Sequence, residues 1–472
     1  MSSVEAGSGP TARMGAWASS LRYEAIPPDV IEHAKLCLLD ALGCALYGST
    51  QPWGRIAAEV AVELSGGGPA SLWGQAGTAS PADAALVNGT ATHGFEIDDI
   101  HVRSLMHPGA IAIPAALALA ESRGTDGRRL LAAIVAGYEV GLRAGICAGI
   151  PHCMRGFHPT GTAGCPGAAA AAAHVIGLTP EQSIHAIAIA STQAAGLYSA
   201  VRTGAMTKRM HAGRAAQSGV MGALMAERGF TGSPDALEAS YGGFMSTLSE
   251  NQDLAPFVET LGREWETAQT GFKAYAACAS AHTIVDALDA MMKQGLNRDN
   301  LERLTIGMSE VGVNNVGWEY RPTSVVGAQM NGYYTAAVKL HDGEAFIDQY
   351  REDRIADKAV LDLIPRIEIR HDPDLDAGGA AKRHAVKARA RAADGRTWEQ
   401  YVEQRRGSPQ HPLGRAELEA KFRRTAGAAL APETVERLID VIFSIERADD
   451  VRALASLLRR PAPARRRATR SV

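Results

Sequence analysis

The first 265 residues are unusually rich in alanine and glycine and have the apolar spacing of helices. Residues 168–173 are six consecutive alanines, the extreme case of this pattern. Alanine is the best helix former, and small side chains let neighbouring helices approach closely. We therefore interpret the pattern as a tightly packed helical bundle rather than as a low-complexity segment.

Apolar residues between Ile31 and Ala45 recur with helical spacing, with Asp29 as a predicted N-cap and Gly48 as a stop. Thr179 and Gln182 flank Pro180 in the form of a capping box. Further helices are predicted at 55–64, 81–95, 109–123, 128–146, 164–176, 180–196, 211–228 and 233–240.

The pattern changes after residue 265. Strands are predicted at 304–309, 367–370 and 386–392, and helices at 280–294, 328–340 and 343–352. Residues 415–458 are predicted to return to the bundle. The expected fold class is mainly α: a large all-helical domain (1–265 with 410–460) and a smaller α+β lid domain (266–409). Residues 461–472, with Arg465 to Arg467 and Arg470, are predicted to be a disordered basic tail.

The net charge and the lack of a recognisable targeting signal argue against several classes of function. The net charge is -3 and the pI is about 6.5, which favours neither nucleic acid nor an anionic membrane as a partner. The longest apolar stretch, residues 105–120, is interrupted by His107 and two prolines. No signal peptide is recognisable, and the six cysteines form no CxxC pair. We expect a cytoplasmic protein with reduced thiols.

The densest polar cluster runs from His93 through Glu96, Asp98 and Asp99 to His101, and His107 follows it. Helical spacing would place His93 and Glu96 on one face. One interpretation is a metal site, another is an acid–base site in which carboxylates orient histidines, and a third is a helix end with solvated acids. The segment has neither an HExxH nor an EF-hand pattern, so the interpretation as a metal site has no support from ligand spacing.

His158 lies among glycine and proline just before the alanine-rich helix, where amide groups can hold a carboxylate. Lys208, Arg209 and His211 precede another apolar helix, as an anion-binding helix start would. A solvated loop or a solvated basic turn is the alternative for both segments.

Lys273 and His282 lie in a mostly apolar stretch. They are interpreted either as core residues or as site residues.

Taken in order, these segments resemble the MmgE/PrpD family. The likeness extends from about Asp29 to Leu340. The motifs that carry it are Leu39-Asp40 with Gly43, Asn88-Gly89, His93 with Asp98-Asp99, His107-Pro108, Gly137-Tyr138-Glu139 with Arg143, Gly161-Thr162, Lys208-Arg209-Met210-His211 with Gly213-Arg214-Ala215, and Gly229-Phe230-Thr231-Gly232.

The resemblance implies a homodimer with no metal or organic cofactor and a site between the two domains that binds a small carboxylate. The residues it implies as catalytic are His107, His158, Lys208, His282, Glu96, Asp98, Asp99 and Tyr334. The predicted substrate-binding residues are Lys273, His211, Arg209 and His101.

The family includes 2-methylcitrate dehydratase, cis-aconitate decarboxylase and iminodisuccinate epimerase. In all three reactions a carbanion forms beside a carboxylate, so cations must stabilise the charge while His107 moves a proton. The sequence departs from the dehydratase pattern at two places. Gly109-Ala110 follow His107-Pro108, and Ala274 and Ala276 lie near Lys273.

We therefore predict a lyase, a dehydratase or decarboxylase of a di- or tricarboxylic acid. An epimerase or isomerase of an amino- or imino-dicarboxylate is the first alternative. A metal-dependent hydrolase built on His93, Glu96, Asp98, Asp99 and His101 is the second, and a non-catalytic helical scaffold is the third.

Overall fold

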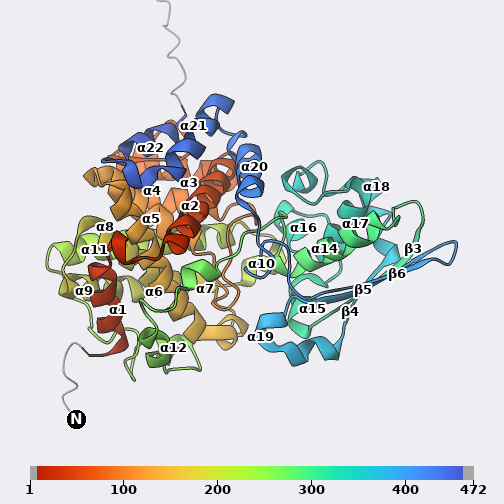
Figure 1. Cartoon of the computed structure of the whole chain (residues 1–472), viewed down its shortest axis with the longest axis horizontal. Helices are drawn as coiled ribbons and strands as arrows, with labels where there is room; N and C mark the ends of the chain where they lie inside the picture. The colour runs from red at the N-terminus through yellow and green to blue at the C-terminus, as the bar shows by residue number, and fades with distance from the viewer. Residues whose placement is uncertain (1–7, 461–472) are drawn as a thin grey trace, which may run out of the picture.

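The computed structural model describes residues 8–460, which form two lobes (Figure 1). The larger lobe is helical apart from a two-stranded ladder of β1 (Ala70–Ser71) and β2 (Thr78–Ala79). Its helices are α1 (Pro10–Ser20), α2 (Pro28–Ser49), α3 (Pro52–Ser65), α4 (Pro81–Thr92), α5 (Gly109–Arg123), α6 (Gly127–Met154), α7 (Pro159–Thr162), α8 (Gly164–Ile176), α9 (Pro180–Ser191), α10 (Ser199–Thr203), α11 (Thr207–Glu227), α12 (Phe244–Leu248) and α13 (Ala255–Glu259), with 3-10 turns at Tyr23–Ala25 and Glu266–Gln269.

The smaller lobe has a four-stranded sheet in the order β4-β3-β5-β6, in which only the β3–β4 pair is parallel. Helices α14 and α17 pack against one face of this sheet (Figure 1). The elements are α14 (Ala279–Lys293), β3 (Leu301–Met308), α15 (Glu310–Val316), α16 (Val325–Gln329), α17 (Gly332–Asp342), α18 (Lys358–Leu361), β4 (Ile367–His371), α19 (Gly379–Lys382), β5 (Val386–Ala392) and β6 (Thr397–Val402), with 3-10 turns at Ile347–Tyr350, Ile364–Arg366 and Pro373–Gly378.

The chain then returns to the larger lobe. Helices α20 (Arg415–Ala426), α21 (Pro432–Phe443) and α22 (Arg452–Leu457) lie over α2 to α5 in Figure 1, and a 3-10 turn at Ile445–Arg447 links the last two. Phe422 packs so closely on Gly43 of α2 that a Cβ there would lie 2.9 Å from its ring. The mainly α fold class expected from the sequence is confirmed.

Close approach between helices explains the small residues. Residues 168–173 of α8 are all buried against α6, α9 and α11. A Cβ added to Gly167 would lie 2.7 Å from the carbonyl oxygen of Gly137, and one added to Gly213 would lie 2.1 Å from the carbonyl oxygen of Leu86. Backbone contacts this short leave no room for a side chain, so glycine is required at the crossings.

Gly213→Val is therefore expected to lower the free energy of unfolding by about 1–3 kcal/mol, since overpacking forces α11 away from α4. Urea unfolding followed by circular dichroism would measure the change. Arg214→Ala, an exposed neighbour on α11, serves as the control and should stay within about 0.5 kcal/mol. Equal stability of the two variants would contradict the close crossing.

Several local predictions are wrong. Helix α2 begins at Pro28 with Pro27 as its N-cap, so Asp29 lies in its first turn, and Gly48 lies inside the helix. Residues 233–240 form turns, because the amide of Leu237 donates to Thr11 Oγ1 and Glu238 accepts from the amide of Thr11. Residues 343–352 contain only a 3-10 turn, since Gly343 ends α17 in the left-handed region.

Other local predictions are confirmed. The capping box at Thr179 and Gln182 is present, and β5 alternates buried and exposed residues as a half-covered strand does.

All six cysteines are free thiols. Among the described residues, α6 is long and apolar enough to span a membrane, but 94% of its most apolar window is buried inside the protein. The predicted basic tail lies outside the described residues.

Candidate active site

A cavity of about 490 Å³ lies where the two lobes meet, and it takes its walls from both. The larger lobe contributes Glu96, Ile100, Leu105, His107, Ile150, Cys153, Met154, Gly156, Tyr198, Ser199 and Lys208. The smaller lobe and the segment leading into it contribute Lys273, Cys278, Ala279, Ser280, Val311, Asn314, Asn315, Trp318, Met330, Arg383 and His384.

The polar cluster of the sequence lies on a buried loop between α4 and α5. Helix α4 ends at Thr92, so the predicted helical face shared by His93 and Glu96 is wrong. Glu96 and Leu105, both in the cavity wall, have left-handed φ angles of 58° and 60°. Such a conformation costs a non-glycine residue about 1–3 kcal/mol, and it persists where tertiary contacts hold it.

The tertiary contacts of Glu96 come from three cations. Lys208 contacts Oε1, Arg209 Nη1 lies 2.5 Å from the same oxygen, and Lys273 Nζ lies 2.9 Å from Oε2. Burial would raise the pKa of Glu96, but Lys208, Lys273 and Arg209 together hold it well below its usual range. Glu96 is therefore ionised, and three positive charges surround one negative charge.

His107 is held by backbone and carboxylate acceptors. Its Nδ1 donates to the carbonyl oxygen of Asp99 at 2.7 Å and lies 3.3 Å from Asp98 Oδ2. These acceptors place the proton on Nδ1, which leaves Nε2 as the nitrogen that can exchange a proton. The site thus contains a histidine oriented for acid–base chemistry at the cavity wall.

Asp98 also binds His93, whose Nδ1 lies 2.6 Å from Oδ2. Burial would raise the pKa of Asp98, but His107 and His93 hold it well below its usual range. Burial lowers the pKa of His93 to about 3, so this histidine is neutral. Asp98 therefore carries the negative charge that would stabilise a protonated His107.

Asp99 has a different role from its neighbour. Its carboxyl accepts hydrogen bonds from Tyr138 at 2.8 Å and from the amide of Gly109 at 3.0 Å. Burial, reinforced by Asp40 and Asp98, raises the pKa of Asp99 well above its usual range. The side chain anchors the start of α5, and only its carbonyl oxygen contacts His107.

Two predicted residues lie behind the wall. His158, the N-cap of α7, packs its ring 5.3 Å from the ring of His93, and its Nδ1 lies 3.1 Å from Nδ1 of His211. Burial and the neighbouring histidines and Lys208 lower the pKa of His158 well below its usual range. Neither His158 nor His211 lines the cavity, so their place is in the layer that supports His93.

Four other predicted residues lie away from the cavity. Arg209 is buried beneath Glu96 and binds Gln329 Oε1 at 2.9 Å. His101 is held between Ser104 and Glu266. His282 is buried with its Nε2 3.2 Å from the carbonyl oxygen of Ala277. Tyr334 donates to the carbonyl oxygen of Gln349 and stacks on Tyr320 within the core of the smaller lobe. Of these, Arg209 alone reaches the site, through Glu96.

Two family models cover most of the chain: the MmgE/PrpD N-terminal domain matches residues 12–256, and the MmgE/PrpD C-terminal domain matches residues 275–446. This chain belongs to the MmgE/PrpD family. The boundary between the two matches falls at residues 257–274, which is the segment that brings Lys273 to Glu96.

Curated MmgE/PrpD relatives are similar along nearly their whole length. The cis-aconitate decarboxylase-like protein oryM of Aspergillus oryzae is 32% identical, over 95% of this chain and 97% of its own. A cis-aconitate decarboxylase of Aspergillus terreus is 32% identical, over 96% of each chain. The human cis-aconitate decarboxylase is 29% identical, over 92% of this chain and 91% of its own.

The part of the MmgE/PrpD site that the sequence did not reveal lies in the smaller lobe. Ser280, Asn315, Arg383 and His384 all line the cavity. The available signal was weak: the basic pair Arg383-His384 lies one residue before the alternating strand β5. The residues around the start of a strand do not reveal that it contributes to a site in another domain.

A metal would find one group of ligands in the described part of this MmgE/PrpD chain. One ligand atom each of His93, Asp98 and His107 lies within 4.8 Å of the others. The five residues of the hydrolase alternative do not converge, because Glu96 is bound by cations and His101 lies on Glu266. The hydrogen bond from His93 to Asp98 would have to break for a metal to bind there.

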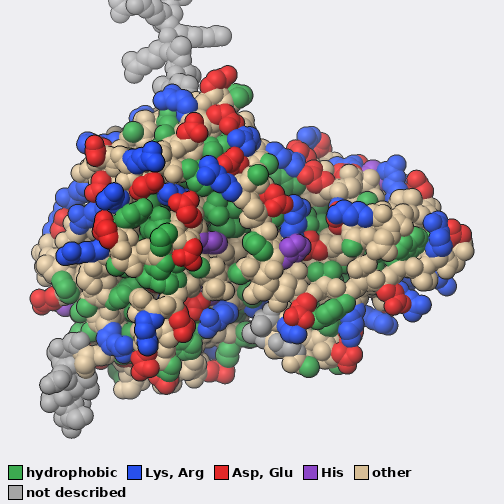
Figure 2. All heavy atoms as spheres, in the orientation of Figure 1, with side chains coloured by type: hydrophobic (Ala, Val, Ile, Leu, Met, Phe, Trp, Pro, Cys, Tyr) green, Lys and Arg blue, Asp and Glu red, His purple; other side chains and the backbone are tan. Residues whose placement is uncertain are grey.

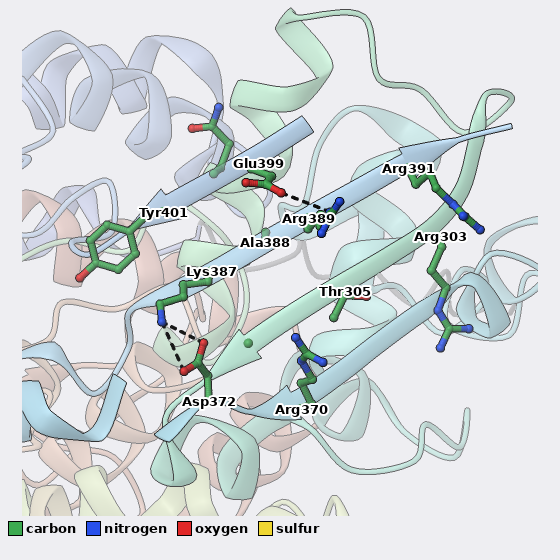
Figure 3. A pocket seen from close by; sticks show the side chains of 12 residues that line it. Arg303, Thr305, Arg370, Asp372, Lys387, Ala388, Arg389, Arg391, Glu399 and Tyr401 are labelled. Atoms are coloured by element: carbon green, nitrogen blue, oxygen red, sulfur yellow. Dashed lines mark hydrogen bonds and ion pairs between the residues drawn. The ribbon is translucent and has the colours of Figure 1, made fainter. Parts of the chain in front are cut away.

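A second hollow, of about 720 Å³, lies on the uncovered face of the β4-β3-β5-β6 sheet (Figure 3). Two pairs of its charged groups are in contact, Lys387 with Asp372 at 3.1 Å and Arg389 with Glu399 at 3.2 Å. Arg303 and Arg391 pair with Glu368 and Glu302, which do not line the hollow. None of the lining residues is a histidine or cysteine. The face of the molecule in Figure 2 likewise intersperses both signs of charge.

Proposed function

We propose that this protein is a carboxy-lyase that removes CO2 from a small tricarboxylate, with cis-aconitate as the first candidate. The observation that carries the proposal is the wall of the cavity between the lobes. There the oriented His107 lies with three cations, Lys208, Lys273 and Arg383, and one acid, Glu96. The names of the relatives support the reaction class.

The charge of the wall favours a substrate with several carboxylates. Arg383 is buried, and although burial lowers its pKa to about 10 it stays charged at neutral pH. Lys208 and Lys273 each have three N–H donors and give one to Glu96, so further donors remain for a ligand. A polyanion would neutralise the excess positive charge of the cavity wall.

Decarboxylation of cis-aconitate uses these groups in a balanced sequence. The C–C bond to the carboxylate on the saturated carbon breaks, CO2 leaves, and the electron pair remains as an allylic carbanion. Its charge spreads to the far end of the allyl system, beside another carboxylate that the lysines would stabilise. His107 Nε2 then delivers a proton to that carbon, giving a methylene-substituted dicarboxylate, and solvent returns the proton to His107.

Nuclear magnetic resonance in deuterated water tests the proposal with cis-aconitate and a panel of di- and tricarboxylates. We expect one CO2 and one carbon-bound deuterium in the product for each cis-aconitate consumed. Loss of water without CO2 would identify a dehydratase, and exchange without net turnover would identify an epimerase. Either outcome for the preferred substrate would overturn the proposal.

Independence of a metal and assembly into a homodimer are two further proposals. Activity that survives exhaustive treatment with a chelator would argue against the metal-dependent alternative. The homodimer implied by the family is testable by light scattering after size-exclusion chromatography.

A further inference from the structure

His384 is fixed in the cavity wall by contacts on both its backbone and its ring. It lies just before β5, and its carbonyl oxygen accepts a hydrogen bond from Thr283 Oγ1 at 2.6 Å. Its Nδ1 lies 3.0 Å from Ser280 Oγ, and Asn315 Nδ2 donates to the same Oγ at 3.2 Å. The imidazole is therefore held at a set orientation by α14 and α15.

This network favours one tautomer of His384. Asn315 fills one acceptor position of Ser280, and the hydroxyl proton of Ser280 has Nδ1 of His384 as its acceptor. A neutral imidazole that accepts at Nδ1 carries its proton at Nε2. Burial, with Arg383 and Arg405 nearby, lowers the pKa of His384 well below its usual range, which keeps the ring neutral.

The Nε2 donor of His384 is left without a partner among the described residues, although the side chain is buried. A buried donor without an acceptor is unfavourable, and native proteins seldom leave one unless a ligand or an ordered water satisfies it. Arg383, the preceding residue, places a guanidinium in the same cavity wall. A neutral N–H beside a guanidinium suits a carboxylate, which accepts hydrogen bonds and carries the opposite charge.

We propose that Arg383 and His384 form a subsite for one carboxylate of the substrate, with Ser280 and Asn315 as positioning residues that set the tautomer of His384. The subsite lies in the smaller-lobe wall, whereas Glu96 and Lys208 come from the larger lobe. It would let the enzyme distinguish tricarboxylates from dicarboxylates. The identity of the substrate rests on the proposed function, but carboxylate recognition at this subsite does not.

Calorimetric binding of two non-reacting ligands tests the subsite: propane-1,2,3-tricarboxylate, and propane-1,3-dicarboxylate, which lacks the central group. The wild type should prefer the tricarboxylate. His384→Phe and Arg383→Met should each weaken tricarboxylate binding about 10- to 100-fold, the range of a charge-assisted hydrogen bond, and leave dicarboxylate binding within about threefold.

Variants of the network provide the controls. His384→Gln keeps an N–H donor and should retain part of the preference. Ser280→Ala should reduce the preference without abolishing it, because the tautomer is no longer imposed. His371→Gln, on the rim of the sheet, should change neither affinity. Circular dichroism checks that each variant folds. If His384→Phe does not fold, Arg383→Met still tests the subsite.

Unchanged affinities for both ligands in folded Arg383→Met and His384 variants would overturn the subsite, whether or not the wild type decarboxylates cis-aconitate. An equal loss of affinity for both ligands would assign the subsite to a terminal carboxylate. Conversely, a preference that depends on His384 in a protein that releases no CO2 would support the subsite and refute the proposed function. The two inferences can therefore fail separately.

Discussion

His107→Gln is expected to lower kcat for the decarboxylation by about 10²–10⁴-fold, the usual contribution of a positioned proton donor. Glutamine can still donate to the carbonyl oxygen of Asp99, which His107 contacts at 2.7 Å, so the loop between α4 and α5 should keep its path. What the variant loses is a group that can deliver a proton to the carbanion. Steady-state kinetics of CO2 release would measure the effect.

His371→Gln is the matched control, because its side chain is 43% exposed, and neither it nor its partner Asp376 lines the cavity. We expect wild-type kcat for this control. A His107→Gln variant that folds and turns over at the wild-type rate would remove His107 from the mechanism. A large rise in KM at constant kcat would instead assign it to substrate binding.

The local parts of the fold could be predicted from the sequence, because they depend on neighbours along the chain. Alternation in residues 386–392 predicts β5, and the residues around Thr179 predict the start of α9. Residues 233–240 show the limit: their composition allows a helix, but contacts with Thr11 hold them in turns.

The candidate site could be predicted only in part, for the same reason. The loop that contains Glu96 is held by Lys208 and Lys273, which lie 112 and 177 residues away in the sequence. Helical spacing around His93 carries no information about those partners. His384 is similarly invisible, because its significance depends on Ser280 and Asn315 in other elements.

Glu96→Gln is expected to lower the free energy of unfolding at pH 7 by about 3–5 kcal/mol. The reason is that removing one partner of a buried ion cluster leaves the other charges uncompensated. Lys208, Arg209 and Lys273 have at most 5% exposed side chains, so solvent cannot replace the lost carboxylate. Glu399→Gln, whose side chain is 68% exposed in its pair with Arg389, should cost at most about 1 kcal/mol.

The difference in free energy of unfolding between the wild type and Glu96→Gln should depend on pH if it comes from the lost charge. It should not depend on pH if it comes from disturbed packing. The pKa of Glu96 is depressed in the folded protein, whereas an unfolded glutamate titrates near ~4.3. As the pH falls, the unfolded state of the wild type therefore binds the proton first, and the stabilisation by the carboxylate is lost. Above about pH 5.5 the advantage of the wild type over Glu96→Gln should be constant, and below about pH 4 it should shrink by up to ~1.4 kcal/mol per pH unit. Urea unfolding of both proteins from pH 7 to pH 3.5 would measure it. A difference that did not change over this range would mean that the glutamine disturbs packing, and that the three cations do not depend on a negative charge at Glu96.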